Sequence, residues 1–177
     1  MKVKRSLLSV LIAVLLVFGM AGGAMAAWGT KEADTEKIAV TFTEKVAVNF
    51  AREVERGGYS FVTSSELKAW IDEKKDMLIV DTNPEGVYKK QHIPGAVHLE
   101  IQRPELTKLD DKLKNALEKI LGPDKNRVIV FYCGFTECTR SHNGAMWSIR
   151  LGYKNVYRHP GGIKAWDESG YLMEKVK

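Results

Sequence analysis

The chain has 177 residues, of which 28% are charged and 45% are hydrophobic, and its formal net charge is +5. Lys2, Lys4 and Arg5 supply three of its 27 cations, so the rest of the chain has 24 basic and 22 acidic side chains, or a net charge of +2. This near-neutral balance, without a stripe of basic and aromatic residues, argues against nucleic acid as a partner. The length that follows the first 26 residues is typical of one globular domain.

The N-terminus has the three-part pattern of a secretory signal peptide. The basic start is followed by an apolar run from Leu7 to Phe18 and by small residues that end in Ala24-Met25-Ala26. We expect residues 1–26 to be a signal peptide that is cleaved after Ala26. The alternative is an uncleaved membrane anchor, but the apolar run is shorter than the roughly 20 residues of a spanning helix. The prediction is a periplasmic or secreted protein with no stable membrane insertion after signal cleavage.

Residues 27–58 are predicted to form a leader and an N-terminal helical extension. Residues 27–36 are small and polar, and we expect them to be mobile. Apolar residues then recur at near-helical spacing up to Gly57-Gly58, which ends the helix. They are Ile38, Phe42, Val46, Phe50 and Val54. The alternation at residues 38–42 also suits a strand. The helix either packs on the domain or serves for docking or dimerisation.

Residues 59–177 alternate between strand patterns and helix patterns. Short runs rich in β-branched and aromatic residues predict strands at 59–62, 77–81, near 98, at 128–132 and at 155–157. Apolar residues at helical spacing, with capping signals, predict helices at 64–73, 85–91, 106–121, 145–151 and 163–168. This order predicts an α/β fold with a mostly parallel five-stranded sheet and helices on both faces. Sites in such folds lie at the carboxyl ends of strands, where Asp81 and Cys133 stand.

One stretch, residues 128–144, has the sequence VIVFYCGFTECTRSHNG and contains the candidate catalytic residues. Cys133 follows the predicted strand, while Ser141 and Asn143 are good N-cap residues for the helix that follows. We expect backbone N–H groups and the positive end of the helix dipole to converge on the Cys133 sulfur, which favours the nucleophilic thiolate. Arg140 adds a cation and a fork of donors for an anionic substrate. The pattern predicts a nucleophilic-cysteine loop.

Both cysteines of the chain, Cys133 and Cys138, lie in this loop. Two cysteines in an exported protein usually form a structural disulfide. A bridge between residues only five positions apart closes little chain and stabilises the fold less than a long-range bridge. The position therefore favours a reactive pair, and whether the two are bridged at rest stays open.

Four segments resemble the rhodanese-like domain family in order and spacing. They are Ile79-Val-Asp81, His92-Ile-Pro-Gly-Ala96, the Cys133 loop ending in Arg140-Ser141, and Leu151-Gly-Tyr-Lys-Asn-Val156 with Gly161-Gly-Ile-Lys-Ala-Trp166. The resemblance covers roughly residues 59–174 and implies the rhodanese-like fold and sulfurtransferase activity. Cys133 matches the family's nucleophile, which takes a sulfane sulfur from a donor such as thiosulfate or polysulfide as a persulfide. The persulfide passes the sulfur to an acceptor thiol, and the chemistry needs no metal or organic cofactor.

The resemblance also implies roles for the residues around Cys133. Arg140 matches the arginine that closes the family's loop and orients anionic donors. The backbone N–H groups of the loop would cradle the persulfide, as an oxyanion hole does. The substrate-binding loop comprises Gly134, Phe135, Thr136, Glu137, Thr139 and Ser141. Asp81 and His92 match structural supports near the loop.

The loop departs from the family pattern in length. Six residues, Gly134 to Thr139, separate Cys133 from Arg140, where the usual sulfurtransferase loop has four. Cys138 is one of the six and is predicted to be an auxiliary catalytic thiol. It would attack the Cys133 persulfide, release sulfide and leave a disulfide. Glu137 is either a proton acceptor in this exchange or a solvated side chain.

Other functions are consistent with the same residues. Cys133 and Cys138 also suit a periplasmic dithiol–disulfide reductase, and the lengthened loop allows a non-catalytic binding module. A metal site of Cys133, Cys138 and His142 lacks a fourth ligand nearby, so we predict no metal. His98, His142 and His159 are interpreted as polar surface or cap residues. The expected partners are a small anionic sulfur donor and a thiol or protein acceptor.

Overall fold

A computed structural model describes residues 22–176 of the chain. The chain divides into two compact units, residues 1–45 and residues 46–177. Helix α2, Gly22–Gly57, contains the boundary between them. The predicted division into residues 1–26, 27–58 and 59–177 stays a prediction.

The described part of the first unit is helical throughout. Helix α2 includes residues 27–36, which contain no proline. The mobility expected of this segment stays a prediction. The strand alternative for residues 38–42 is excluded, although Ile38, Val40 and Phe42 are exposed. Most of the predicted signal peptide lies outside the described residues, so its cleavage stays a prediction. No helix within residues 22–176 is long and apolar enough to cross a membrane.

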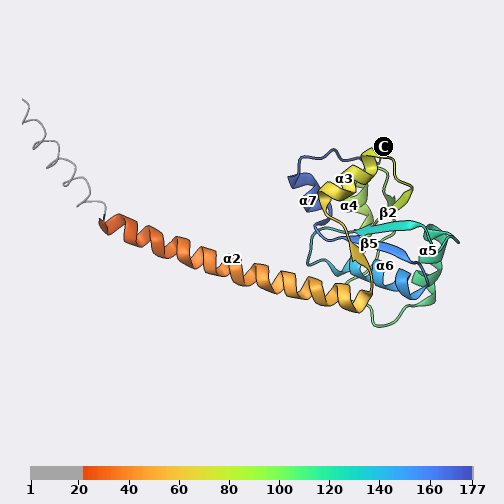
Figure 1. Cartoon of the computed structure of the whole chain (residues 1–177), viewed down its shortest axis with the longest axis horizontal. Helices are drawn as coiled ribbons and strands as arrows, with labels where there is room; N and C mark the ends of the chain where they lie inside the picture. The colour runs from red at the N-terminus through yellow and green to blue at the C-terminus, as the bar shows by residue number, and fades with distance from the viewer. Residues whose placement is uncertain (1–21, 177) are drawn as a thin grey trace, which may run out of the picture. The chain divides into compact units, whose positions relative to one another are not determined.

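The second unit is built on a five-stranded sheet in which every pairing is parallel (Figure 1). The strand order is β1-β5-β4-β2-β3. The strands are β1 Ser60–Phe61, β2 Met77–Asp81, β3 Val97–His98, β4 Val128–Tyr132 and β5 Asn155–His159. The helices of the unit after α2 are α3 Ser64–Asp72, α4 Glu85–Lys90, α5 Asp111–Leu121, α6 Thr139–Arg150 and α7 Gly162–Glu168. The predicted α/β fold with a five-stranded sheet is confirmed.

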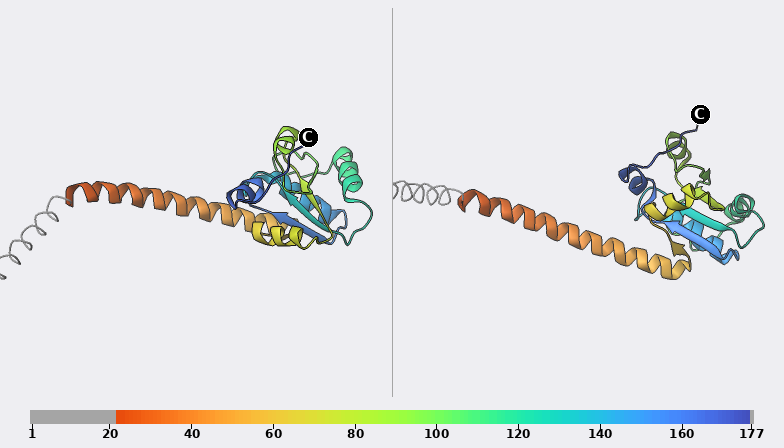
Figure 2. Two further views of the ribbon diagram at one scale, coloured as in Figure 1. Left: turned by 90° about the horizontal axis from the view of Figure 1, so that it is seen from above. Right: turned by 45° about the horizontal axis from the view of Figure 1, so that its top comes forward.

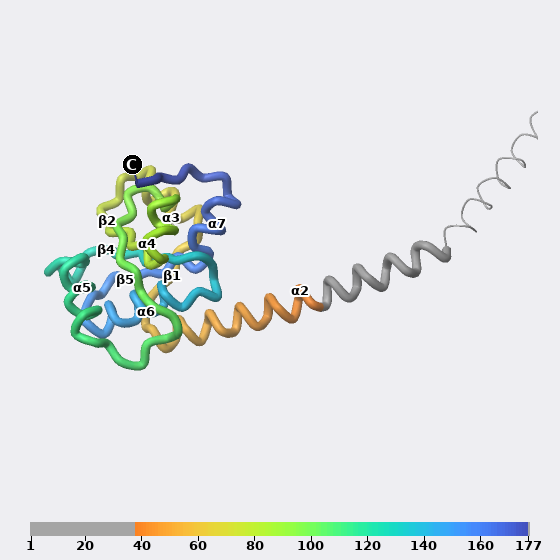
Figure 3. Tube along the Cα trace, turned by 180° about the vertical axis from the view of Figure 1, so that it is seen from behind, coloured from red at the N-terminus to blue at the C-terminus, as the bar shows by residue number. Residues whose placement is uncertain are grey.

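The two faces of the sheet are covered by different helices (Figures 2 and 3). Alternate residues of the central strands point to opposite faces, so Ile129 and Phe131 pack in one core and Val130 and Tyr132 in the other. The first core includes side chains of α5 and α6, and the second includes side chains of α3 and α7. Because both faces are buried at the centre of the sheet, β4 is apolar along its whole length and β2 is apolar up to Asp81, as central parallel strands usually are.

The capping box predicted at the start of α3 is present. The Thr63 side chain accepts a hydrogen bond from the backbone N–H of Glu66, and the Glu66 carboxylate accepts one from the backbone N–H of Thr63. Two of the N–H groups that a helix start leaves unpaired are satisfied in this way.

Two helix starts differ from the sequence prediction. Helix α5 begins at Asp111 and not near Leu106, because Asp110 caps it and the Leu106 N–H donates to Asn143 Oδ1 at 2.9 Å. Helix α6 begins at Thr139 and not at Ala145, so Ser141 and Asn143 are helical residues and Cys138 is the N-cap. The cysteine loop is therefore shorter, and its second cysteine lies at the helix entrance.

Candidate active site

The cysteine loop, residues 133–138, connects the carboxyl end of β4 to the start of α6. Its first residues are held by helix α7, whose Ile163 and Lys164 N–H groups donate to the carbonyl oxygens of Cys133 and Gly134 at 2.9 and 3.1 Å. A side chain at Gly162 would stand 2.3 Å from the Cys133 oxygen, and its φ of +61° also favours glycine. The family segment at Gly161-Gly162 thus has a physical role, which is close packing of α7 on the loop.

The Cys133 sulfur lies inside the loop, against a carbonyl oxygen. The Cys133 thiol donates to the Cys138 carbonyl oxygen at 3.1 Å, and its Sγ is 3.1 Å from Ser141 Oγ. The residue is 1% exposed. Burial is the main reason why the pKa of Cys133 is raised well above its usual value. The structure does not favour the expected Cys133 thiolate, because this sulfur is buried and lies against a carbonyl oxygen.

The Cys138 sulfur has the environment that the sequence predicted for Cys133. It lies at the N-cap of the twelve-residue helix α6, and Arg140 Nη1 is 3.8 Å from it. Interaction with the Cys133 side chain, the backbone N–H groups of Gly134 and Arg140, and the Arg103 side chain lower its pKa to about 4, although burial acts in the opposite direction. The structure thus favours a thiolate at Cys138 and a thiol at Cys133. Both cysteines are free.

Two arginines supply positive charge at the mouth of the loop. Arg140, predicted from the sequence, keeps a spare donor, since no acceptor within residues 22–176 pairs with its buried Nε. Arg103 was not predicted, and its guanidinium carbon lies 5.6 Å from the centre of the Phe135 ring. It belongs to the segment between β3 and α5, and no local motif marks it. Only the tertiary fold brings it to Cys138.

A buried arginine on β5, also missed by the sequence analysis, holds the middle of the loop. Arg158 is fully buried, and its Nη2 donates to the Thr136 and Cys138 carbonyl oxygens at 2.8 and 3.1 Å. Its Nε donates to Ser141 Oγ at 3.0 Å, and its Nη1 is paired with the Glu53 carboxylate of α2. The charge of Arg158 is compensated by Glu53, while three of its hydrogen bonds fix the lengthened loop. A polar residue at the carboxyl end of a parallel strand was the available sequence signal.

The other loop residues form the rim. Phe135 is 43% exposed and Glu137 is also exposed, whereas Gly134, Thr136 and Thr139 are half-buried. Ser141 is buried and contacts both Cys133 and Arg158. Because both sulfurs are almost completely enclosed, a donor reaches them only when this rim moves.

The two predicted supports lie in different places. Asp81 is buried at the end of β2 and accepts from the Asn83 N–H at 2.7 Å, and Asn83 Oδ1 is close to the backbone of Gly134. Burial raises the pKa of Asp81. His92 instead donates from its Nδ1 to the Tyr88 carbonyl oxygen at 2.9 Å, and its backbone pairs with that of Glu174. Among the described hydrogen bonds, none joins His92 to the cysteine loop, so it supports the C-terminal segment.

The interpretation of three histidines as surface or cap residues is wrong for two of them, because His142 and His159 are buried. His142 Nδ1 is 2.8 Å from the Tyr59 hydroxyl, and its Nε2 is 3.4 Å from the Glu105 carboxylate. Its ring is thus engaged with Tyr59 and Glu105. No group of three or more histidine, cysteine or acidic side chains within residues 22–176 is placed to hold a metal ion.

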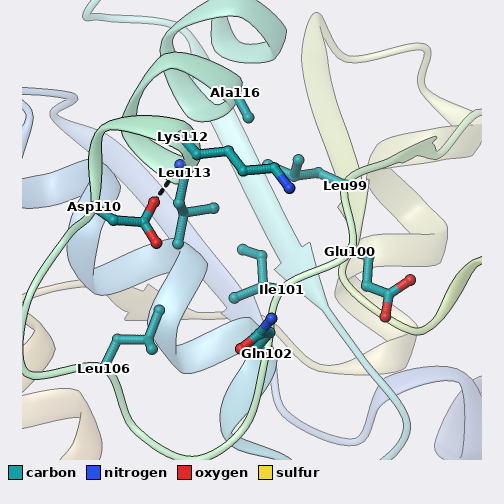
Figure 4. A pocket seen from close by; sticks show the side chains of 9 residues that line it. All are labelled: Leu99, Glu100, Ile101, Gln102, Leu106, Asp110, Lys112, Leu113 and Ala116. Carbon is teal, nitrogen blue, oxygen red and sulfur yellow. Dashed lines mark hydrogen bonds between the residues drawn. The ribbon is translucent and has the colours of Figure 1, made fainter.

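A separate pocket of about 200 Å³ lies between the segment after β3 and helix α5 (Figure 4). Apolar side chains such as Ile101, Leu106 and Leu113 line it together with Glu100 and Lys112. No residue of the cysteine loop is part of its lining. The pocket has neither a nucleophile nor paired cations, so the cysteine loop is the better candidate for an active site.

Comparison with known proteins agrees with this geometry. The family model of the rhodanese-like domain matches residues 63–169. The thiosulfate sulfurtransferase GlpE of Coxiella burnetii is 30% identical over 103 residues, which are 58% of this chain and 83% of that protein. The chain therefore belongs to the rhodanese-like domain family.

Two solved structures share the fold at low sequence identity. A thiosulfate sulfurtransferase from Pseudomonas aeruginosa superposes with a TM-score of 0.58 and 21% identity over 75% of this chain and 23% of that one. The polysulfide-sulfur transferase homodimer from Wolinella succinogenes gives a TM-score of 0.52 and 19% identity over 79% of this chain and 91% of that one.

Proposed function

We propose that the protein is a sulfurtransferase that moves sulfane sulfur from an anionic donor, such as thiosulfate or polysulfide, to an acceptor thiol on a small molecule or a protein. The observation that carries this proposal is the pair of free cysteines in a loop whose mouth has two arginines. Membership of the rhodanese-like family and the names of the Coxiella and Wolinella proteins support the same chemistry.

The chemical steps need only a cysteine thiolate and an anion site. The thiolate attacks the outer sulfur of thiosulfate, the sulfur–sulfur bond of the donor breaks, and sulfite leaves with its electron pair. The product is a cysteine persulfide. An acceptor thiolate then attacks the outer sulfur of the persulfide, and the cysteine leaves as a thiolate. Arg140 and Arg103 would hold the donor and the departing sulfite by charge-assisted hydrogen bonds. The family position of the persulfide is Cys133.

The test is the intact mass of the protein after exposure to thiosulfate or polysulfide. We expect a gain of about 32 Da, one sulfur atom, that a reductant removes. The control is the double variant Cys133→Ser/Cys138→Ser, which should gain nothing. Release of sulfite in equal amount, and transfer of the sulfur to an added thiol, complete the assignment.

A dithiol–disulfide function is the second candidate, and the direct interaction between the two cysteine side chains favours it. It predicts a loss of about 2 Da relative to the reduced protein and no sulfur gain with any donor. That result would replace the sulfurtransferase proposal. A protein that neither gains sulfur nor forms the disulfide would instead be a binding module.

We also propose that the protein works outside the cytoplasm, in the periplasm or as a secreted protein, because residues 1–26 have the signal-peptide pattern. The mass of the protein recovered from a periplasmic extract tests this directly. A chain that begins at Ala27 is expected, and a chain that retains residues 1–26 in the cytoplasm would contradict it.

A further inference from the structure

The two cysteines of the loop differ in what their sulfur atoms contact, and the difference bears on the order of events. Cys133 Sγ faces the Cys138 carbonyl oxygen at 3.1 Å. A carbonyl oxygen accepts hydrogen bonds and repels a negative sulfur, so this geometry requires the protonated thiol. The hydroxyl and the backbone N–H of Ser141 also contact this sulfur and act to lower its pKa, but burial and Cys138 outweigh them.

Cys138 Sγ is surrounded by donors. The guanidinium groups of Arg140 and Arg103 both reach it, and the backbone N–H groups of Gly134 and Arg140 point to it. Its position at the N-cap of α6 adds the positive end of a twelve-residue helix. Every one of these contacts favours the thiolate.

We propose that Cys138, and not the family-position Cys133, is the thiolate that first attacks the sulfur donor and carries the persulfide. The assignment rests on the proposed sulfurtransferase function and changes which cysteine is the nucleophile. Cys138 follows the exposed Glu137 at the rim, whereas Cys133 follows four buried residues of β4. Both cysteines are 1% exposed, and Arg140 Nη1 lies 3.8 Å from the Cys138 sulfur, so an anion held by this arginine is held beside Cys138.

The covalent step balances with these residues alone. The Cys138 thiolate attacks the outer sulfur of thiosulfate, the Cys138 persulfide forms, and sulfite leaves between Arg140 and Arg103. Cys133 keeps its proton and is a hydrogen-bond donor beside the persulfide. Because a protonated thiol is a poor nucleophile, Cys133 does not displace sulfide from Cys138, and the persulfide survives until the acceptor arrives.

The charged groups around Cys138 come from every neighbouring element. Arg140 is on α6, Arg103 is on the segment after β3, and Cys133 is at the end of β4. Arg158 of β5 contacts the Cys138 carbonyl group, and its charge is compensated by Glu53. Glu137 is the nearest acidic residue in the loop sequence and is exposed. Cations outnumber anions around this sulfur, which keeps it ionised near neutral pH.

The first arm of the test alkylates the wild-type protein with iodoacetamide at about pH 6, well below the usual cysteine pKa. Cleavage after Glu137 separates the two cysteines, so each label is read on its own peptide. We expect Cys138 to be labelled at least about ten times faster than Cys133. Faster labelling of Cys133 would overturn the assignment, and this arm needs no variant and no sulfur donor.

The second arm measures sulfur loading from thiosulfate in single variants. Cys133→Ser, whose hydroxyl still donates, should load sulfur a few-fold more slowly than wild type, and Cys138→Ser should load none. Loading by Cys138→Ser with none by Cys133→Ser would overturn the assignment while leaving the proposed function intact. Preferred alkylation of Cys138 in a wild type that never gains sulfur would instead reject sulfur transfer and keep the Cys138 thiolate.

Discussion

The two ends of the cysteine loop place the same kind of side chain in opposite environments. At the strand end, Cys133 is enclosed by the core and contacts a carbonyl oxygen. At the helix end, Cys138 contacts guanidinium and backbone N–H groups. The comparison teaches that burial and the groups around each sulfur, and not position in a family motif, set the direction of its pKa shift. Because α6 begins directly after Cys138, the positive end of the helix dipole lies at the second cysteine.

The difference between the two ends depends on the buried Arg158, so its removal should have the largest effect. Arg158→Met leaves the Glu53 carboxylate without its cation and frees the carbonyl oxygens of Thr136 and Cys138. We expect the free energy of unfolding in urea to fall by about 3 to 5 kcal/mol, because an uncompensated buried charge remains.

The matched control for Arg158→Met is Arg52→Met, at an exposed position on α2, which should change stability by less than about 0.5 kcal/mol. The double variant Glu53→Gln/Arg158→Met should recover part of the loss, since it removes both charges. Equal unfolding curves for Arg158→Met and Arg52→Met would contradict the role of Arg158.

Packing of α7 on the strand end of the loop is tested by Gly162→Ala. The new Cβ would stand 2.3 Å from the Cys133 oxygen at a φ of +61°, so α7 and the loop must separate. We expect a loss of about 2 to 4 kcal/mol in the free energy of unfolding. Gly170→Ala is the control, because its φ is +71° but its Cβ meets no atom within 4 Å. It should cost only about 1 to 2 kcal/mol, and an equal loss in the two variants would show that contact with Cys133 is unimportant.

At the helix end, Arg140→Met should weaken donor binding more than the chemical step. Loss of a charge-assisted hydrogen bond to an anion predicts a roughly 10- to 100-fold rise in KM for thiosulfate. Arg150→Met, at the exposed end of the same helix, is the control and should leave KM unchanged. Arg140→Lys should recover only part of the affinity, because an ammonium lacks the forked geometry. A KM insensitive to both Arg140 substitutions would exclude Arg140 as the anion contact.

The smallest predicted effect comes from raising the pH on the sulfur-loaded protein. Because the pKa of Cys133 is raised, the thiol stays protonated at neutral pH and ionises only in strongly alkaline solution. Its thiolate then attacks the inner sulfur of the Cys138 persulfide, hydrosulfide leaves, and a Cys133–Cys138 disulfide forms. We expect slow sulfide release in alkali, none near neutral pH, and none from Cys133→Ser at either pH. Rapid release from wild type at neutral pH would mean that Cys133 is ionised at rest.

Much of the fold follows from local patterns in the sequence. The apolar strands at Met77–Asp81 and Val128–Tyr132 and the capping box at Thr63 were predictable, because each depends on neighbouring residues. The place of the cysteine loop in the fold was predictable as well, since Cys133 directly follows the apolar strand that ends at Tyr132. The segment at Leu106 was mistaken for helix because its leucines fit the helical period, although they reach the core from an irregular segment.

The electrostatics of the site were not predictable from local patterns. Glu53 and Arg158 are 105 residues apart in the sequence and pair only in the folded chain. Arg103 reaches Cys138 from a segment with no recognisable motif. Arg158 on β5 contacts the loop just before the start of α6 at Thr139, and this early start places the helix N-terminus at Cys138 and not at Cys133.

The most direct test of the account follows the sulfur itself in the wild-type protein. Thiosulfate labelled with radioactive sulfur at its outer position is mixed with the protein for one turnover, the persulfide is trapped by alkylation, and the chain is cleaved after Glu137. The account predicts label on the peptide that carries Cys138 and its full transfer to an added thiol in an untrapped sample. Label on the Cys133 peptide, or no bound label at all, would contradict it.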